Sequence, residues 1–100
     1  MKMLVKIHKS YREVVAVCDS ELLGKRFEEG ILQLEIRENF FKGEEKAEKE
    51  VIEIMKDATM EDATFNIAGK NSVECALNAG IISREGIKTI QNVPFALVLM

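Results

Sequence analysis

Residues Glu13 to Asp19 read Glu-Val-Val-Ala-Val-Cys-Asp, and this stretch decides the fold class. The side chains from Val14 to Cys18 are all apolar, and three of them are valines, whose β-branching favours strands. Because successive side chains of a strand point to opposite faces, an uninterrupted apolar run indicates burial on both faces. We therefore predict that Glu13 to Cys18 forms a central strand of a β-sheet.

Four further segments have the pattern of strands. Alternation of apolar and polar residues predicts a strand from Met3 to His8, which a hairpin connection joins to the central strand. It also predicts a strand from Ile31 to Arg37, with one face exposed to solvent. Near the C-terminus, Ile87 to Gln91 and Phe95 to Leu99 form two more strands, joined through residues 92–94. The last strand is apolar on both faces, which favours a central position beside one of the first two strands.

Two segments have helical periodicity. Glu44 to Ala58 is the longest predicted helix, because its apolar residues fall on one stripe and charged residues cover its other faces. A second helix is predicted from Lys70 to Ala79, followed by Gly80 in the left-handed conformation. Between them, Ala63 to Ile67 can form a short strand.

The order of these elements predicts an α+β fold for one domain that spans residues 1–100. The sheet is mixed or mostly antiparallel, with about five strands, and the two main helices pack on one face. A doubly wound fold needs regular βαβ alternation, which this order does not have.

Composition and charge bound the functional classes. The chain of 100 residues has a net charge of −3, which argues against a strongly basic nucleic-acid binder. No apolar run has the length of a signal peptide or a membrane span, so we expect a cytoplasmic protein. Cys18 and Cys75 fit two buried thiols of a reducing compartment; the alternative is a disulfide in a secreted protein.

Several short motifs follow one another along the chain. They are Val15-Ala16-Val17-Cys18-Asp19, continuing into Glu21-Leu22-Leu23-Gly24-Lys25, and then Phe40-Phe41-Lys42-Gly43, Asn66-Ile67-Ala68-Gly69, Gly80-Ile81-Ile82 and Val93-Pro94. In order and spacing, they resemble the opening signature and the later motifs of a small archaeal family, catalogued as domain of unknown function 424. The resemblance implies an archaeal source and a constant fold, but it implies no activity.

The chain also departs from that family pattern. Residue 41 is Phe in this chain, whereas the family motif has Tyr at this position. Phe95 and Leu97 occupy positions at which relatives often carry His and Gln. If that polar pair performs chemistry in relatives, this chain lacks it.

Cys18 and Asp19 are candidate site residues at the end of the central strand. Active sites often lie at such strand ends, and a helix N-terminus can lower the pKa of a thiol. The competing interpretation, which we favour, is a packed thiol followed by an Asp that caps a short helix at residues 20–23.

The turn before the second helix is a candidate anion site. A Gly that leads into a helix whose first turn carries polar residues makes an N-terminus suited to anions. The alternative is an Asn/Gly turn in which Asn71 or Ser72 only caps the helix. The candidate residues are Asn66, Gly69, Lys70, Asn71 and Ser72.

The N-terminal quarter has a local excess of cations. If the first hairpin and the loop after Leu23 are neighbours, these cations form a basic patch with Tyr11 and Phe27 as stacking rings, which suits an RNA backbone. Nearby acids favour an ordinary solvated surface instead. The candidate RNA contacts are Lys6, Lys9, Arg12, Lys25 and Arg26.

Other chemistry is poorly supported. His8 is the single histidine, and we interpret it as a surface residue without a catalytic partner. One His and two separated Cys cannot supply a structural zinc set, and we expect neither a metal nor a cofactor. Phe40 and Phe41 either fill the core under their loop or form a protein-contact patch.

The sequence leaves two main hypotheses for the function. The first is a non-catalytic binding module, associated with RNA or with a protein complex such as the translation apparatus. The second is a small enzyme, with a site where Cys18 and Asp19 meet the turn at residues 66–72. A homo-oligomer formed through a sheet edge or through the Phe40-Phe41 loop is a further alternative.

Overall fold

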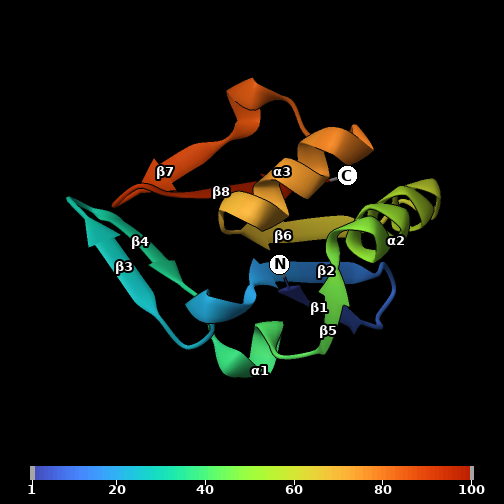
Figure 1. The fold of residues 1–100 in the computed structure, drawn as a ribbon, viewed down its shortest axis with the longest axis horizontal. Coiled ribbons are helices and arrows are strands. Elements are labelled where there is room, and N and C mark those ends of the chain that lie inside the picture. Colours follow the sequence, from blue (N-terminus) through green and yellow to red (C-terminus); the bar gives the residue numbers. More distant parts are fainter. Residues whose placement is uncertain (1, 100) are drawn as a thin grey trace.

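The computed structural model describes residues 2–99, which form a six-stranded sheet, a separate two-stranded hairpin and three α-helices (Figure 1). The strands are β1 (Lys2–His8), β2 (Val14–Asp19), β3 (Arg26–Glu29), β4 (Leu32–Glu35), β5 (Glu44–Ala47), β6 (Thr64–Ala68), β7 (Lys88–Ile90) and β8 (Val93–Val98). The helices are α1 (Glu38–Phe41), α2 (Glu48–Met60) and α3 (Lys70–Ala79), with 3₁₀ turns at Ser20–Leu22 and Arg84–Gly86.

The order of the main sheet is β5-β1-β2-β6-β8-β7. β2 pairs antiparallel with β1 and parallel with β6, and the other neighbours are antiparallel. The predicted central position of the Val-rich strand is therefore confirmed. The sequence predicted the last strand beside one of the first two strands. This prediction is wrong, because β8 lies between β6 and β7.

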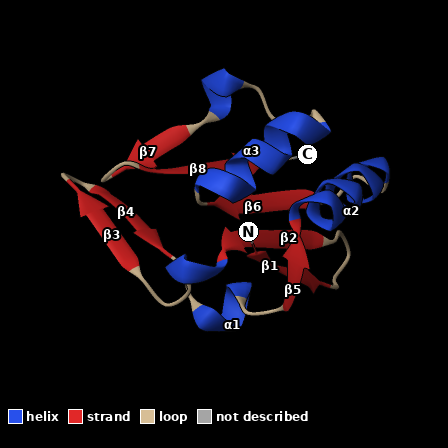
Figure 2. Ribbon diagram, in the orientation of Figure 1, coloured by secondary structure: helices blue, strands red, loops and turns tan. Residues whose placement is uncertain are grey.

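The two faces of the sheet are covered by different elements (Figure 2). α2 and α3 pack on one face, around the buried side chains of Val15, Val17 and Phe65. Ile36 and Phe41, which come from the segment that follows β4, cover one end of the opposite face. The predicted fold class, an α+β protein with a mostly antiparallel sheet and two main helices on one face, is confirmed. None of the described helices has the length and apolar character needed to cross a bilayer.

The predicted start of the longest helix, at Glu44, is wrong. Residues Glu44–Ala47 form the edge strand β5 on β1, and α2 begins only at Glu48. Gly43 permits this pairing, because a Cβ at that position would overlap the carbonyl oxygen of Val5. Backbone hydrogen bonds to β1 therefore override the helical pattern of charges in this segment.

The predicted strand from Ile31 to Arg37 is one arm of a hairpin. β3 pairs antiparallel with β4, so that Phe27 lies opposite Leu34, and Gly30 lies in the turn between them. The hairpin stays outside the main sheet and reaches the β7–β8 turn, where the amide of Gln91 donates a hydrogen bond of 2.7 Å to Glu29 (Figure 1). The sequence analysis missed β3, because Phe27 is one apolar residue among charged ones.

Candidate functional site

Asp19, at the end of β2, binds the N-terminus of α3. One carboxylate oxygen accepts a hydrogen bond from the Asn71 amide at 3.0 Å. The other accepts hydrogen bonds from the amide and the hydroxyl of Ser72, both at 2.8 Å. Asp19 is 2% exposed and Ser72 is fully buried. The prediction that Asp19 caps residues 20–23 is wrong, because its side chain makes no cap hydrogen bond to that 3₁₀ turn.

Gly69 allows the helix to approach this carboxylate. It has a φ of +110°, which side-chain-bearing residues rarely adopt, and a Cβ there would overlap the carboxyl group of Asp19. Its amide donates a hydrogen bond of 2.8 Å to the carbonyl oxygen of Pro94. The Gly that the sequence analysis assigned to an anion site therefore accommodates an anion from the chain itself.

The candidate anion site and the candidate strand end thus meet, but not all of their residues do. Asp19 neutralises the helix N-terminus and occupies the place that an external anion would take. Lys70 stays exposed beside it, on the rim of a small cavity of about 130 Å³. Asn66 is directly opposite Ala16 in the sheet, so its side chain lies on the other face from Asp19.

Cys18 also faces away from α3 and has no exposed surface. Burial, followed by the charges of Asp19 and Glu21, raises the pKa of its thiol from the ordinary 9.0 to about 12. Burial and the charge of Glu48 raise the pKa of Cys75 to about 11. Both cysteines are free of disulfides. Neither thiol has the electropositive, accessible surroundings of a catalytic cysteine.

The five candidate RNA contacts do not form one patch. Lys9 and Arg12 lie in the turn before β2, whereas Lys25 and Arg26 follow its other end. Lys6, in the middle of β1, donates a hydrogen bond of 3.1 Å to the carbonyl oxygen of Asn39. The turn of the first hairpin and the loop after Leu23 therefore lie at opposite ends of β2, although Leu4 of β1 packs near Leu22 and Leu23.

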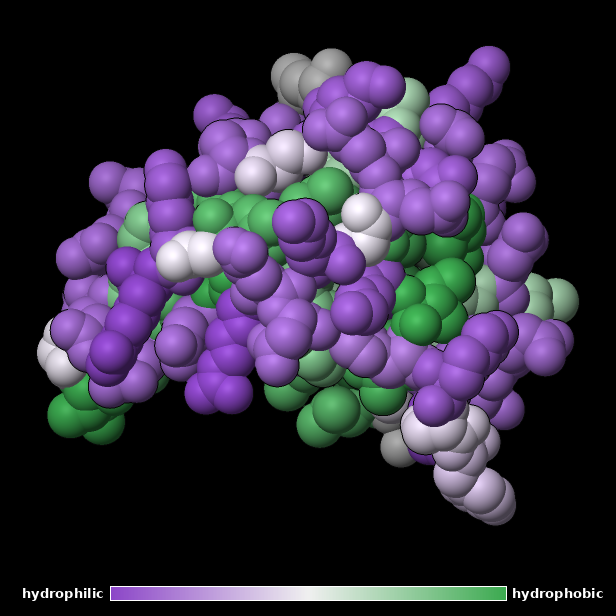
Figure 3. Space-filling view, turned by 90° about the horizontal axis from the view of Figure 1, so that it is seen from below, coloured by the Kyte–Doolittle hydropathy of each residue, from purple (hydrophilic) through white to green (hydrophobic). Residues whose placement is uncertain are grey.

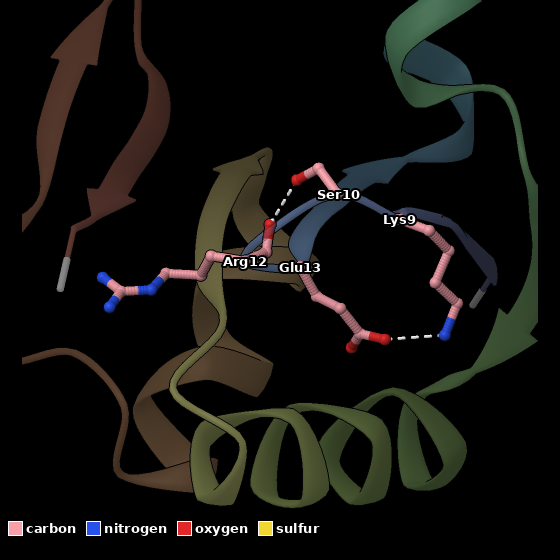
Figure 4. A network of polar contacts seen from close by, with 4 residues as sticks. All are labelled: Lys9, Ser10, Arg12 and Glu13. Carbon is pink, nitrogen blue, oxygen red and sulfur yellow. Dashed lines mark hydrogen bonds and ion pairs between the residues drawn. The ribbon is translucent and has the colours of Figure 1, made fainter.

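The basic residues at the two ends of β2 also have different charged partners. Lys9 pairs with Glu13 at 2.6 Å, and Arg12 points away from this pair (Figure 4). At the other end, Arg26 pairs with Glu28 at 2.8 Å. Beside the first turn, Tyr11 is fully exposed and lines a cavity of about 350 Å³ that also includes acids of the α2–β6 turn.

A surface on the sheet itself was not predicted from the sequence. Side chains that share the face opposite α2 and α3 lie in rows across the strands. One row joins Lys6, Ala16, Asn66 and Leu97, which are directly opposite one another on β1, β2, β6 and β8. The next row joins His8, Val14 and Thr64.

These rows are only partly covered. Ala16 is buried, but Leu97 is 55% exposed and the other residues of the two rows are half-buried. Figure 3, which views the molecule from below the orientation of Figure 1, shows hydrophobic side chains at the surface between hydrophilic ones. We call the accessible part of the rows the open face; its residues are Lys6, His8, Val14, Thr64, Asn66 and Leu97.

Aromatic rings border the open face. The His8 ring stacks on Phe40 with centroids 4.6 Å apart, and its Nε2 donates a hydrogen bond of 2.8 Å to the Phe40 carbonyl oxygen. His8 is therefore half-buried, with its ring packed on Phe40 and not free in solvent. Phe41 is only 6% exposed, so it fills the core under its loop, and Phe40 meets it edge-on.

A groove of about 160 Å³ lies beside the open face. Asn66 and Leu97 form one side, and Leu34, Phe41 and Phe95 contribute to its walls. Phe95 and Leu97 thus line a cavity in this chain. No group of three or more His, Cys, Asp or Glu residues within residues 2–99 is arranged to hold a metal ion.

The fold and this site define a small α+β protein with one helix-covered and one partly open sheet face. The chain belongs to the family described as Protein of unknown function (DUF424), whose model matches residues 8–100. This confirms the resemblance in the sequence motifs.

A solved structure has the same fold. It is the crystal structure of an uncharacterized conserved protein from Methanopyrus kandleri, with a TM-score of 0.86 and 22% sequence identity. The match covers 100% of this chain and 95% of that one. No curated protein matches the chain. The source of the structural neighbour, an archaeon, agrees with the archaeal family that the sequence motifs indicate.

Replacing Asp19 by Ala should lower the free energy of unfolding by about 2–4 kcal/mol, because buried donors of α3 lose their acceptor. A cap of an exposed turn contributes only about 1 kcal/mol. Urea denaturation of D19A measures the difference. The control is E21A, an exposed acid of the adjacent turn, for which a change within about 0.5 kcal/mol is expected. Equal, small losses in both variants would contradict the bridging role of Asp19.

Both cysteines should resist iodoacetamide at pH 7.5 in the folded protein, because the thiolate is the reactive form and both pKa values are raised. In urea, both should be alkylated within the same reaction time. Mass spectrometry of the intact protein counts the modified thiols. Rapid alkylation of Cys18 in the folded state would contradict its burial and would favour the enzyme hypothesis.

Proposed function

We propose that the protein is a non-catalytic, cytoplasmic binding module that contacts single-stranded RNA through the open face. A cytoplasmic location suits two unpaired thiols. The composition of the open face carries the proposal. Its six residues include a lysine and a histidine but no acid, on a chain whose net charge is −3.

The groups on and around the open face match what a single-stranded RNA requires. Lys6 offers a cation for a phosphate, and its position on β1 places it at one end of a row that crosses four strands. Thr64 and Asn66 offer hydrogen-bonding side chains in the middle strands. Phe40 and Phe95 are half-buried rings at the margins, and exposed ring surfaces are platforms on which bases stack.

This proposal relocates the RNA contact from the predicted patch to the sheet. Of the original candidates, Lys6 belongs to the open face, and Lys9 and Arg12 are in the turn that directly follows His8. Lys25 and Arg26 lie at the far end of β2 and are not part of the proposed contact.

The enzyme hypothesis finds less support. It requires Cys18, Asp19 and Asn66 to converge on one polar pocket. Asp19 is instead bound to α3, Cys18 is enclosed by apolar side chains, and Asn66 lies on the opposite face from Asp19.

The substitution Lys6→Glu tests the proposal. It should weaken the binding of a fluorescent single-stranded RNA at low salt and lower the slope of log K against log salt by about one, because one phosphate contact is lost. Fluorescence anisotropy measures both quantities, and thermal melting confirms that the variant is folded.

The matched control is Lys49→Glu on α2, an exposed lysine on the helical side of the molecule. It changes the net charge by the same amount but should leave the RNA affinity nearly unchanged. Equal losses in both variants would mean that only net charge matters. No binding by the unmodified protein at low salt would overturn the proposal and leave a protein partner as the occupant of the open face.

A further inference from the structure

Asn66 is an unusual residue for the middle of the sheet. β6 is a central strand, and Asn66 lies directly between Ala16 of β2 and Leu97 of β8. Asn is among the residues that are depleted in strands, and a valine would suit this position better. Within residues 2–99, its half-buried carboxamide makes no hydrogen bond to another residue. The position therefore carries a polar group that the fold does not use.

Asn66 lines the groove of about 160 Å³ together with apolar residues whose side chains lie on the same side of the molecule: Leu34, Phe41, Ala68, Phe95 and Leu97. Pockets for drug-sized ligands and cofactors have volumes of roughly 300–1,000 Å³. The groove is thus too small for a dinucleotide or a similar cofactor. Its apolar walls also exclude a phosphate or a metal ion as the occupant, because both need charged or multiple polar ligands.

A carboxamide presents one acceptor and one donor side by side, in a plane. The edge of adenine presents the complementary pair, an amino group next to a ring nitrogen, and Asn pairs with it through two hydrogen bonds. The apolar walls suit the faces of a planar ring. We propose that this groove receives a single adenine base of a single-stranded RNA and that Asn66 recognises its edge.

This inference rests on the proposed function, since the base would enter from a strand that lies across the open face. It adds a specific claim, namely that one base is bound apart from its phosphate. Asn66 is a specificity-determining residue in this arrangement, whereas Lys6 contributes sequence-independent affinity.

The test uses eight-nucleotide RNA chains that differ only in their bases. One chain carries a single adenosine among abasic riboses, and the other is wholly abasic, so both have the same phosphates. Anisotropy at low salt should show that the protein binds the chain with adenosine about 5- to 100-fold more tightly, as expected for one two-bonded base contact. In N66V this ratio should fall to near one, while the affinity for the abasic chain stays unchanged.

The stability of N66V separates recognition from folding. Because the carboxamide has no hydrogen-bond partner among residues 2–99, N66V should unfold at the same or a higher urea concentration than the unmodified protein. A control variant, N78A, removes an exposed carboxamide from α3 and should keep the preference for adenosine.

The outcomes distinguish the inference from the proposed function. Tight binding of both chains without a preference for adenosine would overturn the adenine pocket and leave RNA contact through the open face in place. An adenosine preference that persists in N66V would also overturn it. Binding of neither chain, together with no binding of an all-base RNA, would remove the proposed function itself.

Discussion

The hydrogen bonds between the Asp19 carboxylate and the N-terminus of α3 hold the architecture together. They join the end of one central strand, β2, to the helix that follows the other, β6. A buried carboxylate is costly unless donors surround it, and here two amides, a hydroxyl and the positive end of the helix dipole do so. The absence of a side chain at Gly69 makes the approach possible. One acid therefore fixes the direction in which α3 leaves the sheet.

The placement of α3 has a consequence for the opposite face. With α2 and α3 both on one side, only the short segments around β3, β4 and α1 are left to cover the other. They enclose Cys18 and Ala68, and Phe40 of α1 also stacks on His8, but Val14 and Thr64 of the next row stay half-buried. This leaves an accessible sheet surface with polar and aromatic groups at its margins. The proposed RNA contact depends on this incompletely covered surface.

The local patterns of the sequence predicted most elements, whereas long-range pairing decided the rest. The Val-rich strand, α3 and the terminal hairpin follow from apolar periodicity and turn residues. β5 could not be predicted, because Glu44–Ala47 has a helical charge pattern and becomes a strand only through its pairing with β1. The same holds for the partner of Asp19, which is more than fifty residues away in the sequence. The open face was missed because the register of four strands creates it.

Photo-crosslinking of a single-stranded RNA to the protein, followed by mass mapping of the modified peptides, locates the bound RNA on the surface. RNA contact through the open face predicts that crosslinks concentrate on that face and its bordering rings, in peptides that contain His8, Phe40 or Phe95. Crosslinks confined to the loop with Lys25 and Arg26, or to α2 and α3, would contradict it.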